Sequence, residues 1–240
     1  MIQNTILKPE LSQPIFPLNL RNVNEIFPGF ASGDFAVLQG SSVSSLISLL
    51  CVKSQLPTQM GGLQSNVIFI DGGNTFGLYQ IAKFAQLYHL NPKQVLDSIY
   101  LSRAFTAYQA TALIMHYLKE AFKKYKAKLV IISDIAGFFL DTDIPEDESQ
   151  RIFSQVTTFL SNFARETQTI VIATYPKHER TPRNNFLHTV TNAKASVILS
   201  LKRTSYSRQF VLEKHPYLPS KVAELPLEDL TLVDFAEGNA

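Results

Sequence analysis

The sequence has a single cysteine and no long apolar run, and each shortage excludes a class of protein. Cys51 has no partner for an internal disulfide, and the apolar helical run around it, 46–52, favours a buried structural thiol. No apolar run approaches the length needed to cross a membrane, and no charged-then-apolar signal opens the chain. We therefore expect a cytoplasmic protein with no membrane partner.

Histidine is also sparse, and the five histidines are scattered without the spacing of metal ligands. Together with the one cysteine they form no nucleophilic triad, so we expect no catalytic residue and no metal site from these groups. The acidic loop 141–148 lacks the glycine and the glutamate of an EF-hand, because Glu146 and Ile152 hold those places. Its acids instead suit a solvated helix N-terminus, where the macrodipole favours negative charge.

What the chain does contain is an alternation of apolar runs and amphipathic segments. Continuous apolar runs are typical of strands that are buried on both faces of a parallel sheet, and helices between them predict right-handed crossovers. The runs are Phe35–Leu38, Val67–Asp71, Leu129–Asp134 and Ile170–Thr174, with a further strand at Ile99–Ser102, a helix at Tyr108–Lys124 and a hairpin at Ser196–Lys202 and Ser207–Lys214. The predicted fold class is α/β, with a mostly parallel central sheet flanked by helices and a C-terminal edge hairpin.

Composition divides the chain into three parts. Residues 1–28 hold four prolines and are predicted to be an extended lead-in with one short helix at Asn22–Ile26. Residues 29–225 are long enough to form one core domain. From Pro216 onward the chain is predicted to be loose, and residues 226–240 form an acidic tail.

The segment that follows the first predicted strand has the layout of a phosphate loop. A working loop has the form Gly-x-x-x-x-Gly-Lys-(Ser/Thr), but after Gly40 the places of Gly and Lys hold Ser45 and Leu46. Amides at a helix N-terminus attract anions even without lysine, and the hydroxyls of Ser41, Ser42, Ser44 and Ser45 could add donors. Weak nucleotide binding and a plain turn with a helix cap both remain open.

Several runs together resemble the ATPase core of the archaeal RadA recombinases and their RecA-type relatives. The matching segments are Val67–Phe76, Asn91–Phe105, Leu129–Asp134, Ile170–Thr174 and Phe186–Lys202, and the likeness covers roughly residues 20 to 225. The resemblance implies a RecA-like P-loop NTPase fold. It also implies that Asp134 matches the acid that holds magnesium in the family, although without a phosphate ligand to share the metal we favour a carboxylate that caps the segment after the strand.

The departures from the family pattern are as informative as the matches. The family's N-terminal helical DNA-binding domain and its Phe-x-x-Ala polymerisation motif are not found in the sequence. Leu46 stands at the place of the phosphate-loop lysine, and Gly73 stands at the place of the catalytic glutamate. Since phosphoryl transfer depends on positioning and charge stabilisation, these losses predict a pseudo-ATPase in which ATP and magnesium binding is weak or vestigial.

A basic stretch lies where the resemblance places the family's second DNA-binding loop. Cations interleaved with aromatic side chains can meet phosphates and stack bases, although an ordinary solvated loop has a similar composition. The candidate DNA-binding residues are Lys177, His178, Arg180, Arg183, Phe186, Lys202 and Arg203.

These observations predict a RadA-like protein without catalysis, acting as an accessory factor in homologous recombination or DNA repair. It would contact single-stranded DNA, or it would dock on an active recombinase of the same fold. Two alternatives remain: a DNA-dependent ATPase with an unusual phosphate loop, and a regulatory interaction module without DNA contact. A homo-oligomer is compatible with each of them.

Overall fold

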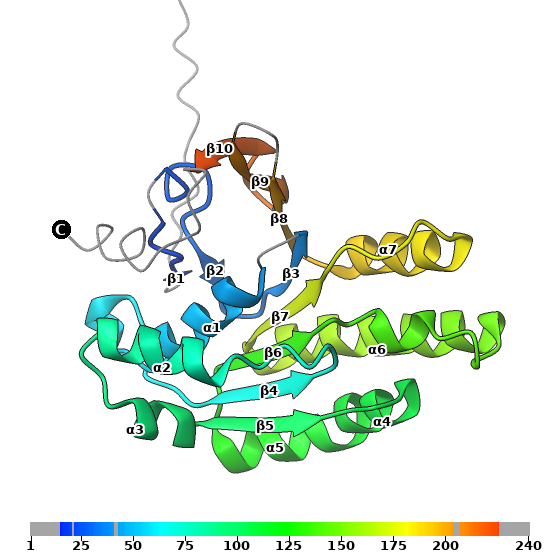
Figure 1. The fold of residues 1–240 in the computed structure, drawn as a ribbon, viewed down its shortest axis with the longest axis horizontal. Coiled ribbons are helices and arrows are strands. Elements are labelled where there is room, and N and C mark those ends of the chain that lie inside the picture. Colours follow the sequence, from blue (N-terminus) through cyan, green and yellow to red (C-terminus); the bar gives the residue numbers. More distant parts are fainter. Residues whose placement is uncertain (1–14, 21, 41–42, 204–206, 226–240) are drawn as a thin grey trace, which may run out of the picture.

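The computed structural model of the chain describes residues 15–20, 22–40, 43–203 and 207–225, and its centre is an eight-stranded sheet (Figure 1). The strands follow the order β10-β9-β8-β3-β7-β6-β4-β5 across the sheet. Their bounds are β3 Phe35–Gly40, β4 Val67–Asp71, β5 Ile99–Arg103, β6 Leu129–Ser133, β7 Ile170–Tyr175, β8 Val197–Arg203, β9 Arg208–Lys214 and β10 Lys221–Leu225. A small second sheet pairs β1 (Ile15–Phe16) with β2 (Phe30–Ala31).

Six neighbouring strands, from β8 to β5 in the sheet order, run parallel. Strands β9 and β10 extend the sheet on one side as antiparallel neighbours. The runs that form β4 and β6 are buried at every position, because helices cover both faces of the sheet at the centre (Figure 1). The predicted α/β fold with a mostly parallel sheet is therefore confirmed.

The helices divide between the two faces according to the alternation of side chains along the strands. In β3, Ala36 and Leu38 join one apolar cluster, whereas Phe35 and Val37 join the other. The first cluster includes α1 (Val43–Lys53), α2 (Leu78–Leu87) and α3 (Pro92–Asp97). The second includes α4 (Ala107–Ala112), α5 (Leu118–Tyr125), α6 (Glu146–Thr167) and α7 (Pro182–Lys194). In the described residues, none of these helices is long and apolar enough to cross a membrane.

Local signals mark the starts of α3 and α6. The Asn91 side chain accepts hydrogen bonds from the amides of Lys93 and Gln94, and Pro92 fills the first helical position. The first turn of α6 contains the acids at 146–148, and the helix ends at Thr167. The acidic loop thus leads into a helix N-terminus, where the macrodipole favours its charge.

Two predicted segments differ from the structure. The single helix expected at 108–124 is interrupted by a π-helical turn at Leu113–Tyr117, within which Ile114 is buried. The stretch after Pro216 is not loose throughout, because residues 221–225 form β10. The sequence pattern of this edge strand is short, because only Ala223 and Leu225 are buried, at alternate positions.

The lead-in packs into the core on the α1 face. Phe16, Leu18 and Phe27 are fully buried in the apolar cluster that includes α1. A buried lysine completes the attachment, since Lys53 Nζ donates to the carbonyl oxygens of Pro17 (2.9 Å) and Leu18 (3.0 Å). The short helix expected at 22–26 is a turn rather than a regular helix.

Candidate functional site

A cavity of about 730 Å³ lies at the edge of the sheet where β3, β7 and β8 end. Open α/β sheets bind ligands outside the carboxyl ends of their strands, because the loops that leave the strands gather there. The lining residues are Gln39, Gly40, Tyr175, Pro176, Lys177, His178, Arg180, Asn184, His188, Ser200, Leu201, Lys202 and Glu213. The cavity therefore brings the start of the predicted phosphate loop next to the predicted DNA-binding loop.

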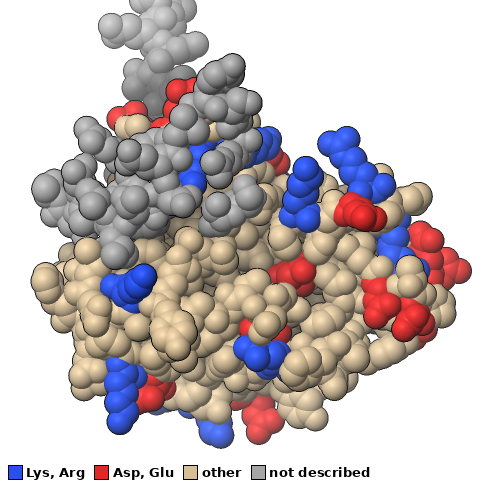
Figure 2. Space-filling view, viewed as in Figure 1, with Lys and Arg blue, Asp and Glu red and all other residues tan. Residues whose placement is uncertain are grey.

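Three cations line this cavity, and they differ in how they are held. Lys177 and Arg180 are exposed, and neither has an ion-pair partner within the described part of the chain. Lys202 Nζ lies 2.9 Å from a carboxylate oxygen of Glu213. Burial acts to raise the pKa of Glu213, but hydrogen bonds from Lys202 and Ser200 bring it below its ordinary value. Figure 2 shows Lys and Arg side chains at the right of the molecule, toward which β4 and β5 point in Figure 1.

Aromatic rings and amides form the inner wall of the cavity. The ring of Tyr175 lies in edge-to-face contact with the rings of His178 and His188, at centroid distances of 5.8 and 5.2 Å. Gln39 bridges β3 to α7, since its amide donates to Asn192 (2.6 Å) and its carbonyl oxygen lies 3.2 Å from His188 Nε2. Sequence reasoning missed Gln39, His188 and Glu213, which no local motif marks.

Gly40 is held against a neighbouring strand. Its φ is 99°, and a Cβ added there would lie 2.1 Å from the carbonyl oxygen of Leu201 in β8. Glycine is therefore required by the close approach of two parallel strands, independently of any ligand.

In the described part of the predicted phosphate loop, Ser44 and Ser45 have structural partners. Ser41 and Ser42 lie outside the described residues, so their predicted roles as donors and as a helix cap stay predictions. The Ser45 hydroxyl accepts a hydrogen bond from Gln80 (2.7 Å), and the carbonyl oxygen of Ser44 accepts one from Ser48 (3.0 Å). Leu46, at the place of the family's lysine, is fully buried in the core.

Asp134 is the first residue after β6, and its carboxylate already has two donors. Oδ1 accepts from His178 Nε2 (2.8 Å) and from the amide of Gly137 (3.0 Å). A Cβ on Gly73 would lie 3.0 Å from the Cβ of Asp134, tighter than most such contacts. The hydrogen bond thus ties His178, in the loop after β7, to the end of β6.

Asp71, the last residue of β4, is a structural cap. Its buried carboxylate accepts hydrogen bonds from the Ser133 hydroxyl (2.7 Å) and the Thr75 amide (2.9 Å), and it lies 3.3 Å from the Arg103 guanidinium. These bonds fix the turn 72–76 against β5 and β6.

Two of the remaining predicted DNA-binding residues, Arg183 and Phe186, do not line the cavity. The guanidinium of Arg183 donates to the carbonyl oxygens of Asp141 and Ile144, so it ties the start of α7 to the loop after β6. Phe186 lies on α7 with 36% of its surface exposed. Arg203 is the last residue of β8.

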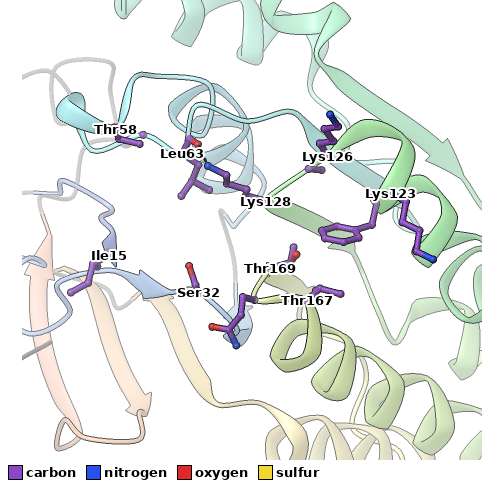
Figure 3. Close-up of a pocket in the computed structure, with 13 residues that line it drawn as sticks. Ile15, Ser32, Thr58, Leu63, Lys123, Lys126, Lys128, Thr167 and Thr169 are labelled. Carbon is purple, nitrogen blue, oxygen red and sulfur yellow. Dashed lines mark hydrogen bonds between the residues drawn. The ribbon is translucent and has the colours of Figure 1, made fainter. Parts of the chain in front are cut away.

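A second cavity, of about 510 Å³, lies at the opposite edge of the sheet, before β6 and β7 begin (Figure 3). Lys123, Lys126 and Lys128 line it, but Lys128 donates to the carbonyl oxygen of Leu63. In Figure 3, Lys123 and Lys126 point away from its centre. Helices α5 and α6 end here, and lysines are favoured at helix C-termini by the macrodipole. These lysines therefore have a structural explanation.

The parallel sheet, the helices on both faces and the cavity at the strand ends define a protein of the RecA-like class. A family model described as Rad51 matches residues 21–182, which is more than half of the chain. The chain belongs to the Rad51 family.

One curated relative is the DNA repair protein Rad51 homolog of Drosophila melanogaster, which is 32% identical over 120 residues. The match covers 50% of this chain and 33% of that protein, so the chain spans about a third of the relative's length.

Proposed function

We propose that this protein is an accessory factor in recombination or DNA repair that contacts single-stranded DNA at the cavity and does not hydrolyse ATP. Membership of the Rad51 family supports a role in recombination or repair, and the Drosophila relative is named as a DNA repair protein. DNA and a recombinase of the same family are plausible partners on the same ground.

The observation that carries the DNA proposal is the pair of exposed cations beside aromatic rings. Lys177 and Arg180 have no ion-pair partner in the described residues, and Lys202, which is paired with Glu213, lines the same cavity. Phosphates would meet these cations, while a base would stack on the half-buried ring of His178. Such contacts need no particular base, so the proposed ligand is single-stranded DNA of any sequence.

Replacing Lys177 and Arg180 together by alanine should weaken oligonucleotide binding about tenfold at low salt. The slope of log affinity against log salt should fall by about 1.4, because two phosphate contacts to a single strand are lost. Fluorescence anisotropy of a labelled oligothymidine measures both quantities. Lys123→Ala with Lys126→Ala is the matched control, since it removes the same charge at the opposite edge of the sheet. Equal losses in the two double variants would contradict a site at the cavity.

The proposal that ATP is not hydrolysed is supported by three described residues. Leu46 is buried where a lysine would meet phosphates, Gly73 provides no carboxylate, and Asp134 is held by His178. This arrangement does not fit a magnesium nucleotide, because these three described positions offer the phosphates no cation and magnesium no free acid.

Calorimetric titration with ATP and magnesium should show no binding tighter than about millimolar. A phosphate-release assay with single-stranded DNA present should show no turnover. Asp134→Asn is the control, because any heat that depends on magnesium at this site should disappear in that variant. Submillimolar binding or measurable turnover would favour the DNA-dependent ATPase instead.

A second candidate, docking on an active recombinase, is favoured by an exposed apolar strip beside the edge strand β5. Leu101 is 40% exposed, Phe105 71% and Tyr108 52%. Exposed apolar groups of this kind mark interaction surfaces more often than isolated ones do. If the unmodified protein fails to bind DNA, the DNA proposal is wrong and docking on an active recombinase remains as the proposed function.

A further inference from the structure

The cavity at the ends of β3, β7 and β8 is lined by exposed cations on one side and by buried polar groups on the other. Lys177 and Arg180 are exposed, whereas Gln39, Asn184 and Ser200 are buried. The two cations without an ion-pair partner in the described residues therefore face solvent, and uncharged polar groups lie inside. This order suits a ligand that carries phosphate on one side only.

Hydrogen bonds close the cavity at one end of the groove between α7 and β9. Helix α7 runs back from the cavity edge toward the start of β8 (Figure 1), and Asn184 near its start lines the cavity. Asn192, eight positions or roughly 12 Å further along the helix, does not line it. The Asn192 side chain accepts from Gln39 (2.6 Å), and its carbonyl oxygen accepts from Lys214 of β9 (2.9 Å). These bonds join α7 to β3 and β9, so a strand cannot continue along α7 past Asn192.

Glu213 places a negative charge on the wall of the cavity, and a carboxylate repels phosphate. It lies 2.9 Å from Lys202 and also accepts a hydrogen bond from Ser200. Because a carboxylate has about four acceptor sites, these two bonds leave room for one from a hydroxyl group. This wall therefore favours a hydroxyl group over a second phosphate.

The end of a DNA strand has this distribution of groups. Every interior nucleotide has phosphate on both sides of its sugar, whereas a terminal nucleotide ends in a hydroxyl on one side. We propose that the cavity takes one terminal nucleotide of a single strand, with its linking phosphate at Lys177 and Arg180 and its hydroxyl at Glu213. The cavity volume of about 730 Å³ lies in the range of pockets that enclose a ligand of this size. This inference rests on the proposed function, because it states which part of the strand binds there.

A circular strand tests the inference because it has no end. The full chain is bound to an oligothymidine that is labelled on an internal base, and unlabelled linear and circular competitors of equal length are compared by fluorescence anisotropy. We expect the linear strand to compete about tenfold more effectively. Equal competition would overturn end recognition, would leave the proposed function intact, and would favour an interior nucleotide turned into the cavity. An unmodified protein that does not bind the labelled strand would overturn the proposed function, and end recognition with it.

A phosphate added to a terminal hydroxyl shows which end of the strand enters. We expect one of the two end-phosphorylated oligothymidines to bind about tenfold more weakly than the unmodified strand. The added charge would meet Glu213 while Lys202 is already paired, so it would lack a cation of its own. The other end-phosphorylated strand should bind as the unmodified strand does. Equal affinities for all three strands would overturn the contact between the terminal hydroxyl and Glu213.

Glu213→Gln and Glu224→Gln form a matched pair for the same measurement. The amide in Glu213→Gln keeps the shape of the side chain and releases Lys202, so this variant should bind the weakened strand at least as tightly as the unmodified one. Glu224→Gln removes the same charge from an exposed position on β10 that does not line the cavity, so it should keep the tenfold preference for the hydroxyl end. A preference that survives in Glu213→Gln would overturn the proposed position of the strand end.

Discussion

Replacing Gly40 by alanine should destabilise the fold by about 3 to 5 kcal/mol. The added Cβ would lie 2.1 Å from the carbonyl oxygen of Leu201, and the φ of 99° is costly for any residue with a side chain. Because the clashing atom is backbone in a neighbouring strand, β3 and β8 have to separate to relieve it. Urea unfolding followed by circular dichroism measures the loss as a lower midpoint at unchanged slope.

Gly33→Ala is the matched control for this prediction. Gly33 has a similar φ of 90°, but its added Cβ would meet the flexible side chain of Gln168 at 3.2 Å. The free-energy cost of a positive φ is therefore similar at both positions, but Gly33→Ala causes no clash with a neighbouring strand. We expect this variant to lose about 1 to 2 kcal/mol of stability. Equal losses at the two positions would show that Gly40 is not required by the approach of β8, and a ligand-binding role would then be the better account.

The stability of the protein should rise by about 1.5 kcal/mol between pH 7 and pH 8.5 because of Lys53. Burial lowers the pKa of Lys53 from 10.5 to about 7 in the folded protein. Between these two values the unfolded chain binds a proton that the folded chain does not, so raising the pH favours the folded state. Below the folded pKa, lysine is charged in both states and the dependence disappears. Unfolding free energies from urea titrations at several pH values measure the slope.

Lys53→Met removes this dependence and is the control. The variant leaves the carbonyl oxygens of Pro17 and Leu18 without their donor, so its stability is lower at pH 8.5, but its slope should be flat. Burial also raises the pKa of Cys51, which makes stability fall once the unfolded thiol ionises above about 8.5. The comparison therefore stops at pH 8.5. A parent protein whose slope equals that of Lys53→Met would disprove the assignment.

The strands of the central sheet could be predicted because a strand that is buried on both faces consists of a continuous run of apolar residues. β4 and β6 are short, continuous apolar runs, whereas a helix that packs on one face shows apolar residues only every three or four positions. β10 could not be predicted, because an edge strand buries only alternate residues. Only two of its five residues are buried, which is too few to show a pattern. The packing of the lead-in against the core could not be predicted for a similar reason, because its buried residues are separated by polar residues and prolines.

The candidate site was easiest to predict where its residues follow one another in the chain, although Gly40 and Lys202 were also predicted and line the cavity. Lys177, His178 and Arg180 form one basic stretch, and the cavity contains all three. The partners that decide their roles come from elsewhere: Glu213 pairs with Lys202 from the neighbouring strand, and Asp134 binds His178 from 44 residues away. Such pairings depend on sheet order, which periodicity does not encode.

The guanidinium of Arg183 has a mechanical consequence. Its two bonds to the carbonyl oxygens of Asp141 and Ile144 join α7 to the loop after β6, and the bond between His178 and Asp134 joins the same two regions a few residues away. Because these bonds join the two regions at neighbouring points, the regions cannot rotate about a hinge between them. A strand of DNA entering the cavity would therefore meet a wall that shifts as one piece, and any movement it causes at α7 would be transmitted to the start of α6.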